Sequence, residues 1–233
     1  MITVLFGPPC VGKGTVAREL CSDSAYVLIP AGELLRCIQG QPSLINLSAH
    51  PSGPQLRAAW EPAYAELLNS GRFLPDDYVI RLVDLYKAGF PSSSKFLYDG
   101  FPRNLSQVIA LDLSLRQSGH NPKDLQFITL EAPDEKLKER NHLRFMTGQR
   151  ADDDPATFAD RLRTYRQSAV DICHYYRKSG REIEIDAGGT IQETVVKLRK
   201  ELGRSYAVSL PLLPPISESY SPGDRQRARA VNP

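Results

Sequence analysis

The stretch GPPCVGKGT, residues 7–15, constrains the fold of this chain more than any other feature of the sequence. It follows the apolar run ITVLF (2–6) and precedes a helical pattern that begins near Lys13. Gly7 and Gly12 permit the backbone angles that turn several N–H groups onto one anion. The helix N-terminus adds partial positive charge, and Lys13 adds a full charge. A strand, a glycine-rich turn and a helix in this order predict a phosphate-binding loop.

The loop departs from the common pattern Gly-x-x-x-x-Gly-Lys-Ser/Thr immediately after its lysine. Gly14 occupies the expected hydroxyl position, and the hydroxyl follows one residue later as Thr15. Gly14 leaves no side chain where the helix starts against the sheet. Thr15 remains a candidate ligand for phosphate or Mg²⁺. We therefore interpret the loop as a functional variant.

Short apolar runs alternate with helical patterns along most of the chain, which is typical of a parallel sheet with crossover helices. Strands are predicted at 2–6, 26–30, 95–100, 125–131 and 182–185. Helices are predicted at 13–22, 31–40, 104–118, 134–146, 155–178 and 190–202. We expect a three-layer α/β fold of the phosphate-loop type, in which helices flank a central parallel five-stranded sheet.

Two insertions and a tail interrupt this alternation. We expect one domain over residues 1–202, with a small helical lobe at 41–74 and a short charged lid loop at 145–155. Residues 203–233 carry five prolines and no helical or strand period, so we expect a mobile tail outside the fold.

Composition excludes several classes of function. The net charge of +2 gives no reason to expect nucleic acid or membrane partners, and the first apolar run is too short for a signal peptide or a membrane span. The cysteines are irregularly spaced and form no C-x-x-C pair: Cys10, Cys21, Cys37 and Cys173. We therefore expect reduced thiols and a cytoplasmic location. We also expect the protein to be a monomer.

A second anion site is predicted beside the phosphate loop. PAGELLR (30–36) follows the second strand and ends with Arg36, and YDGFPRN (98–104) follows the third strand with Asp99 and Arg103. The carboxyl ends of parallel strands border the ligand crevice of such a sheet. Two arginines there can hold one phosphate through charge-assisted hydrogen bonds.

A third group of cations lies around the lid loop. Arg140 and Arg144 are four residues apart and hence on one helix face. Asp154 is a good N-cap and Pro155 a good first helical residue, so the next helix is predicted to start there. The loop and this helix supply further charges, namely Arg150, Asp152, Asp153 and Arg161. Phosphoryl transfer needs cations around its charged oxygens, which makes these arginines candidates for that chemistry.

Together these motifs resemble those of the nucleoside monophosphate kinases, and most closely those of short-lid adenylate kinases, over roughly residues 1–202. The motifs that match are GPPCVGKGT, PAGELLR, DGFPR and the R-x-x-x-R pattern before the lid. The lid sequence GQRADD (148–153) resembles the family pattern G-R-x-D-D but departs from it by the inserted Gln149. Cys10 and Val11 replace the glycine and small residue common in that family. The resemblance implies reversible transfer of the γ-phosphoryl group of MgATP to AMP, giving two ADP. It also implies a lid without zinc, since the lid carries no cysteine.

The resemblance assigns roles residue by residue. ATP would be contacted by Gly7, Pro8, Cys10, Val11, Gly12, Lys13, Gly14, Thr15, Arg140, Arg144, Gly188 and Gly189. AMP would be contacted by Ala31, Gly32, Arg36, Phe73, Leu74, Gly100, Arg103, Gln107, Arg150 and Arg161. The catalytic group would be Lys13, Arg103, Arg140, Arg150 and Arg161. Asp99 would hold Mg²⁺ through water, with Thr15 as a second possible ligand, and Asp152 and Asp153 would orient the arginines.

The identity of the acceptor base stays open at this point. Ala31 and Asn104 match the UMP/CMP kinases, whereas Gln107 matches the adenine-reading glutamine of adenylate kinases. An amide can serve adenine or cytosine, and the longer reach of glutamine favours AMP. The alternatives are a UMP/CMP kinase and a nucleotide-binding module without catalysis, in which Cys10 and Val11 disable the loop. A switch GTPase is disfavoured because the sequence has no N-K-x-D motif.

Overall fold

The computed structural model describes residues 2–22, 26–41, 43–69, 72, 74–117, 119–121, 125–147 and 153–202. All of them belong to one compact unit, Met1–Gly203. The predictions made for the tail 203–233, for Phe73 and for residues 148–152, which include Arg150 and Asp152, lie outside the described residues.

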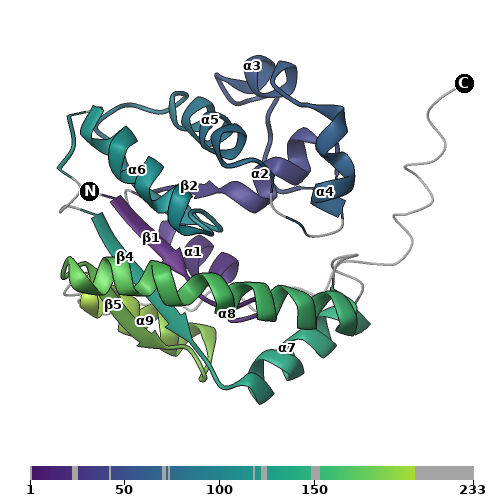
Figure 1. The fold of residues 1–233 in the computed structure, drawn as a ribbon, viewed down its shortest axis with the longest axis vertical. Coiled ribbons are helices and arrows are strands. Elements are labelled where there is room, and N and C mark those ends of the chain that lie inside the picture. The colour runs from purple at the N-terminus through teal and green to yellow at the C-terminus, as the bar shows by residue number, and fades with distance from the viewer. Residues whose placement is uncertain are drawn as a thin grey trace, which may run out of the picture. The chain divides into compact units, whose positions relative to one another are not determined.

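The centre of the unit is a parallel sheet of five strands in the order β2-β3-β1-β4-β5 (Figure 1). The strands are β1 (Ile2–Phe6), β2 (Tyr26–Pro30), β3 (Lys95–Asp99), β4 (Leu125–Glu131) and β5 (Glu182–Asp186). Leu5 of β1 pairs with Asp99 of β3, so the carboxyl ends of these strands meet at one edge of the sheet. This arrangement confirms the fold predicted from the sequence.

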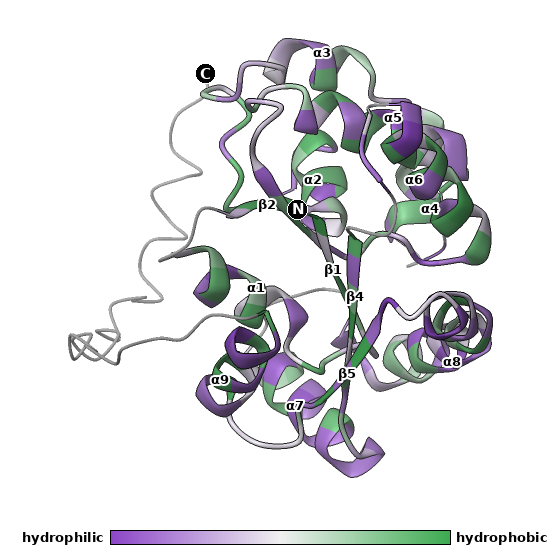
Figure 2. Ribbon diagram, turned by 90° about the vertical axis from the view of Figure 1, so that its left-hand side faces the viewer, coloured by the Kyte–Doolittle hydropathy of each residue, from purple (hydrophilic) through white to green (hydrophobic). Residues whose placement is uncertain are grey.

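Successive strand residues point to opposite sides of the sheet. Because the strands carry apolar residues on both sides, helices cover both faces. Val4 of β1 packs into one apolar cluster with α2 (Ala31–Ile38), α5 (Asp76–Lys87) and α6 (Leu105–Gln117). Leu5 packs into the other cluster. Its helices are α1 (Lys13–Ser22), α7 (Asp134–Met146) and α9 (Ile191–Glu201). Helix α8 (Pro155–Lys178) contributes to both clusters. Figure 2 shows α1 and α9 on one side of the strands and α6 and α8 on the other.

Capping side chains begin two of the helices, and the cap of α8 is the one predicted from the sequence. The side chain of Asp154 accepts hydrogen bonds from the N–H groups of Ala156 at 3.1 Å and Thr157 at 3.0 Å, which starts α8 at Pro155. Thr190 and Glu193 form a capping box at the start of α9. Such caps satisfy backbone N–H groups that have no partner inside the helix.

The segment between β2 and β3 is more helical than predicted. The expected lobe at 41–74 contains α3 (Gly53–Ala58), a 3₁₀ turn η1 (Pro62–Tyr64) and α4 (Ala65–Asn69). The predicted helices omit α5, and this omission is wrong. Its buried residues Val79, Leu82 and Val83 recur at helical spacing, so the pattern was present in the sequence.

Within the part of the chain that the structure describes, no helix combines the length and the apolar character needed to cross a membrane.

Candidate active site

The phosphate loop joins β1 to α1 with unusual backbone angles at three positions. Gly7 has φ +150°, Gly12 has φ +102°, and Cys10 has φ +63°. A positive φ near 60° is strained for a residue with a β-carbon. Cys10, rather than the β-branched Val11, carries this angle, and Val11 is buried instead. Cys10 and Val11 are therefore compatible with the conformation of the loop, although Cys10 adopts a strained backbone angle.

Lys13 closes the loop on itself. Its Nζ donates hydrogen bonds to the carbonyl oxygens of Gly7 at 2.7 Å and Pro8 at 2.8 Å. Burial lowers the pKa of Lys13 to about 8, an effect that Asp99 opposes and that Arg103 and Arg161 reinforce. An anion bound in the loop would favour the protonated form of this amine.

Asp99 at the end of β3 lies against the start of α1. A β-carbon on Gly14 would lie 3.3 Å from Oδ2 of Asp99, which explains the glycine after Lys13. Asp99 and Thr15 both border the cavity described below. Their carboxylate and hydroxyl oxygens are the hard donors that Mg²⁺ prefers, and Mg²⁺ typically takes few protein ligands and keeps waters and substrate phosphates. The residues present therefore fit a magnesium ion that arrives with a nucleotide.

The two arginines of the predicted acceptor site converge. A β-carbon on Gly32 would lie 2.9 Å from Nη2 of Arg103 and 3.7 Å from Nη1 of Arg36. A β-carbon on Gly100 would lie 3.2 Å from the same Nη2 of Arg103. Arg103 is held by a hydrogen bond of 2.7 Å from its Nε to the carbonyl oxygen of Gly100. Both guanidinium groups thus lie together at the carboxyl edge of the sheet, with glycine backbone close to them.

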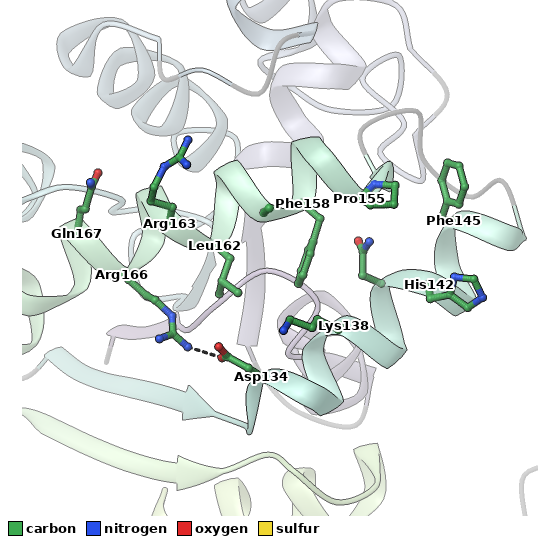
Figure 3. Close-up of a pocket in the computed structure, with 12 residues that line it drawn as sticks. Asp134, Lys138, His142, Phe145, Pro155, Phe158, Leu162, Arg163, Arg166 and Gln167 are labelled. Carbon is green, nitrogen blue, oxygen red and sulfur yellow. Dashed lines mark hydrogen bonds and ion pairs between the residues drawn. The ribbon is translucent and has the colours of Figure 1, made fainter.

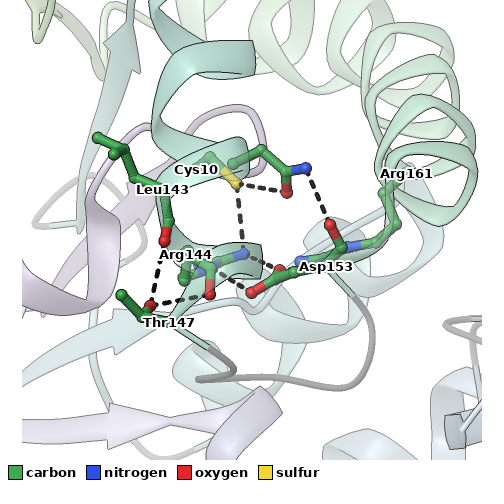
Figure 4. Close-up of polar contacts among 7 residues, drawn as sticks. Cys10, Leu143, Arg144, Thr147, Asp153 and Arg161 are labelled. Carbon is green, nitrogen blue, oxygen red and sulfur yellow. Dashed lines mark hydrogen bonds and ion pairs between the residues drawn. The ribbon is translucent and has the colours of Figure 1, made fainter.

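A buried carboxylate organises the arginines beside the lid loop (Figure 4). Asp153 accepts hydrogen bonds from Arg144 through both of its carboxylate oxygens, and Nη1 of Arg161 lies 3.7 Å from Oδ1. Nδ2 of Asn141 donates to the backbone carbonyl of Asp153 at 2.9 Å. These contacts place Arg144 and Arg161 at one carboxylate, Asp153.

Cys10 ties this cluster to the phosphate loop. Its thiol donates to Oδ1 of Asn141 at 3.4 Å, and its sulfur accepts from Nη2 of Arg144 at 3.3 Å. Burial raises the pKa of the Cys10 thiol, and Arg144 opposes that effect. The thiol is therefore a contact between the loop and α7 rather than an activated nucleophile.

Arg140 has a different environment from the other arginines of the site. Its guanidinium donates to the carbonyl oxygens of Val11 at 3.2 Å, Ala187 at 2.9 Å and Gly189 at 2.7 Å. It joins the phosphate loop to the loop after β5. In this structure its hydrogen bonds go to backbone groups.

A cavity of about 940 Å³ brings most of the predicted residues together. Those in its wall are Gly7, Cys10, Gly12, Lys13, Gly14, Thr15, Gly32, Arg36, Asp99, Gly100, Arg103, Arg144 and Arg161. The other described residues that were predicted to bind nucleotide lie off this wall: Pro8, Val11, Ala31, Leu74, Gln107, Arg140, Gly188 and Gly189. Of these, Gln107 is 2% exposed and forms hydrogen bonds within the protein.

Sequence reasoning missed several residues of the cavity wall. Among them are Arg18, Arg72, Thr157, Thr164, Tyr165 and Ser168. Thr157, Thr164 and Ser168 lie on α8 together with Arg161, at successive spacings of four, three and four residues. This spacing indicates one face of a helix. Arg18 follows Gly14 by four residues in the same way. Arg72 follows the helical part of the small lobe and has no such pattern to mark it.

A second cavity, of about 760 Å³, lies between α7 and α8 (Figure 3). Phe145, Phe158 and Leu162 line it, and an ion pair between Arg166 and Asp134 borders it. Its described lining includes none of the residues predicted to bind phosphate. We therefore assign the chemistry to the larger cavity, where the cations converge.

No group of three or more histidine, cysteine or acidic side chains that could together hold a metal occurs among the described residues.

Such a fold, with Lys13, Arg36 and Arg103 in the wall of one cavity, places the chain in the class of phosphate-loop nucleotide-binding proteins. The family model "Adenylate kinase" matches residues 5–181 of the chain. An adenylate kinase of Hyphomonas neptunium is 34% identical over 208 residues, which cover 88% of this chain and 100% of that protein. An adenylate kinase of Phenylobacterium zucineum is 31% identical over 198 residues, covering 85% of this chain and 95% of that protein. An adenylate kinase of Thermus thermophilus is 29% identical over 200 residues, covering 86% and 96% respectively.

The chain belongs to the adenylate kinase family. This membership confirms the resemblance found in the sequence.

Proposed function

We propose that this protein is an adenylate kinase, which transfers the γ-phosphoryl group of ATP to AMP and runs the reaction in both directions. The observation that carries the proposal is that one cavity holds three groups of cations. They are Lys13 of the phosphate loop, the pair Arg36 and Arg103, and the pair Arg144 and Arg161. A site that binds a single nucleotide phosphate chain would not need the separate pair Arg36 and Arg103.

The donor nucleotide binds at the phosphate loop in this proposal. The loop N–H groups and the start of α1 hold the polyphosphate, and Lys13 exchanges its carbonyl contacts for phosphate oxygens. Asp99 and Thr15 hold the magnesium ion. Held there, such an ion would supply positive charge against the negative charge that develops on the phosphate groups. The contacts of Arg140 with Ala187 and Gly189 support a role for the loop after β5 beside the donor base.

The acceptor phosphate lies between Arg36 and Arg103. The missing side chains of Gly32 and Gly100 leave room for the guanidinium groups of these arginines beside the backbone. Because the attacking group is an ionised phosphate oxygen, no general base is needed. Catalysis then consists of aligning the two phosphates and neutralising the charge between them.

Arg144 and Arg161 act on the transferred group. Asp153 fixes their positions, so they need not reorganise when the reaction occurs. We also propose that the lobe at 41–74 and the lid loop at 145–155 close over the bound nucleotides and exclude water, and that Arg150 and Phe73 take part there.

AMP is the proposed acceptor rather than CMP or UMP. The names of the relatives support this choice, since each of those described above is an adenylate kinase. The match of Gln107 with the adenine-reading glutamine of that family also supports it. That Gln107 reads the base stays a prediction, because its amide is bonded to Arg103 and Asp76 in this structure.

Initial rates with AMP, CMP and UMP under saturating MgATP test the proposal. We expect kcat/KM for AMP to exceed the other two at least tenfold. We expect Arg103→Ala to lower kcat/KM for AMP by about 10- to 100-fold, because a charge-assisted hydrogen bond to phosphate is lost. Arg116→Ala, which changes an exposed arginine of α6, is the matched control and leaves the rate unchanged. A preference for CMP or UMP, or ATP binding without turnover of any monophosphate, would refute the proposal.

We further propose that the protein acts as a monomer in the cytoplasm. None of the four cysteines forms a disulfide, which supports a reducing compartment. Sedimentation at assay concentration tests the oligomeric state, and a dimer would contradict it.

A further inference from the structure

Asp76, the first residue of α5, is bonded to two side chains at the start of α6. Its Oδ1 accepts hydrogen bonds from Nδ2 of Asn104 at 2.8 Å and from Nε2 of Gln107 at 2.8 Å. These partners lie 28 and 31 residues away in the sequence. Asp76 therefore joins the segment that follows the small lobe to the loop that carries Arg103.

The amide of Gln107 is held from two directions. Its Oε1 accepts from the backbone N–H of Arg103 at 2.7 Å, while its Nε2 donates to Asp76. A backbone N–H can only donate and a carboxylate can only accept, so both contacts require the same orientation of the amide. Only 2% of Gln107 is exposed, so its amide depends on these partners within the protein.

The amide in turn fixes the backbone of the acceptor arginine. The N–H of Arg103 is bonded to Gln107, and its Nε is bonded to the carbonyl oxygen of Gly100 at 2.7 Å. Its Nη2 then lies beside Gly32 at the acceptor position. A continuous set of hydrogen bonds thus runs from Asp76 through Gln107 to Arg103.

We propose that Asp76 is a positioning residue for phosphoryl transfer, which holds Arg103 at the acceptor phosphate by anchoring the amide of Gln107. This inference rests on the proposed function. Asp76 acts on a residue that binds phosphate, and every nucleoside monophosphate carries that phosphate. Its loss therefore weakens binding of both AMP and CMP and leaves binding of ATP unchanged.

The variants Asp76→Ala, Asp76→Asn and Asp77→Ala test this inference. Asp76→Ala removes the acceptor, whereas Asp76→Asn keeps an acceptor oxygen at the same place. Asp77→Ala is the matched control, since Asp77 is the neighbouring exposed acid in the first turn of α5. Its substitution removes the same favourable charge at the helix N-terminus as Asp76→Ala does.

We expect Asp76→Ala to raise KM about five- to tenfold for both AMP and CMP, because this factor corresponds to the loss of one well-made hydrogen bond. KM for ATP should stay unchanged. Asp76→Asn restores most of the wild-type KM, and Asp77→Ala behaves as wild type. Hydrogen exchange provides a readout that does not depend on activity: the N–H of Arg103 should exchange faster in Asp76→Ala than in Asp77→Ala, measured on variants with native far-UV circular dichroism.

Three results would overturn the inference. If wild type phosphorylates AMP and Asp76→Ala matches Asp77→Ala in KM and in exchange at Arg103, Asp76 has no positioning role, while the proposed function stands. If KM rises for AMP alone, Asp76 acts on base recognition and not through Arg103. If wild type phosphorylates no nucleoside monophosphate, the proposed function fails and this inference fails with it.

Discussion

Asp153 is fully buried and holds the guanidinium of Arg144 with both of its carboxylate oxygens, one of them 2.6 Å from Nε. The same carboxylate lies 3.7 Å from Arg161. A buried carboxylate between two cations fixes both of them before any substrate arrives. It thus links a buried position before α8 to two arginines of the cavity wall.

Removal of Asp153 should impair both stability and catalysis. We expect Asp153→Ala to lower the free energy of unfolding by about 2–3 kcal/mol, because Arg144 loses its charged partner, and to lower kcat at least tenfold. Urea denaturation and steady-state kinetics measure the two effects. Asp171→Ala, at an exposed position of α8, is the control and should change neither. Wild-type kcat in Asp153→Ala would contradict the role assigned to this carboxylate.

Nucleotide binding should take up a proton at Lys13. Burial lowers the pKa of Lys13 to about 8 in the empty site, and phosphate oxygens favour the charged amine. At pH 8 we therefore expect binding of MgATP to take up roughly half a proton. Calorimetric titration in two buffers of different ionisation enthalpy measures this uptake, and Lys13→Met should abolish it. Equal uptake in wild type and Lys13→Met would assign the proton to another group.

The same pKa shift has a consequence for stability. Between about 8 and the ordinary value of 10.5, the unfolded chain holds a proton at Lys13 that the folded empty protein has lost. Since stability rises with pH wherever the unfolded state binds more protons, Lys13 contributes an increase in the free energy of unfolding across this window. The difference between wild type and Lys13→Met in urea denaturation at pH 8 and pH 10 should show that increase. A decrease would contradict the lowered pKa.

The backbone angle of Cys10 predicts that glycine is more stabilising than alanine at this position, the reverse of their usual order within a helix. At φ +63° glycine carries no β-carbon strain, so Cys10→Gly should be more stable than Cys10→Ala by about 1 kcal/mol. Cys21, in the last turn of α1, is the control, because there alanine should be more stable than glycine by about 0.5–1 kcal/mol. Urea denaturation of the four variants decides the matter. The same order at both positions would contradict the strained conformation of Cys10.

The buried pair of Asp112 and Arg181 should matter for stability alone. Two hydrogen bonds of 3.0 and 2.9 Å join them, and both side chains are at most 8% exposed. We expect Asp112→Ala to lower the free energy of unfolding by about 3–5 kcal/mol, because it removes the charged partner of a buried guanidinium. Glu139→Ala breaks an exposed pair with Lys136 and should cost less than about 1 kcal/mol. Equal effects of the two variants would contradict the difference in burial.

The sequence was sufficient to predict the sheet and the phosphate loop, because their signals are local. Apolar runs mark the strands, and the glycines and Lys13 mark the loop. The prediction omitted α5 although its apolar residues recur at helical spacing. The convergence of Arg36 and Arg103 followed from their places after neighbouring strands, since parallel strands end at a common edge.

Other features of the site depend on contacts between distant residues. Gln107 matches a base-reading position, but Asp76 and the backbone of Arg103 occupy its amide in this structure. The carbonyl oxygens of Val11, Ala187 and Gly189 likewise surround Arg140. Neither arrangement leaves a pattern in the sequence, because the partners come from separate segments of the chain.

Reaction of the protein with ADP and Mg²⁺ alone tests the central claim most directly. An enzyme that holds two nucleotides in one cavity and moves a phosphoryl group between them converts ADP into equal amounts of ATP and AMP. We expect both products to form at equal rates in wild type, and neither to form in Lys13→Met. ADP that stays unchanged, or inorganic phosphate released in place of ATP, would contradict the account.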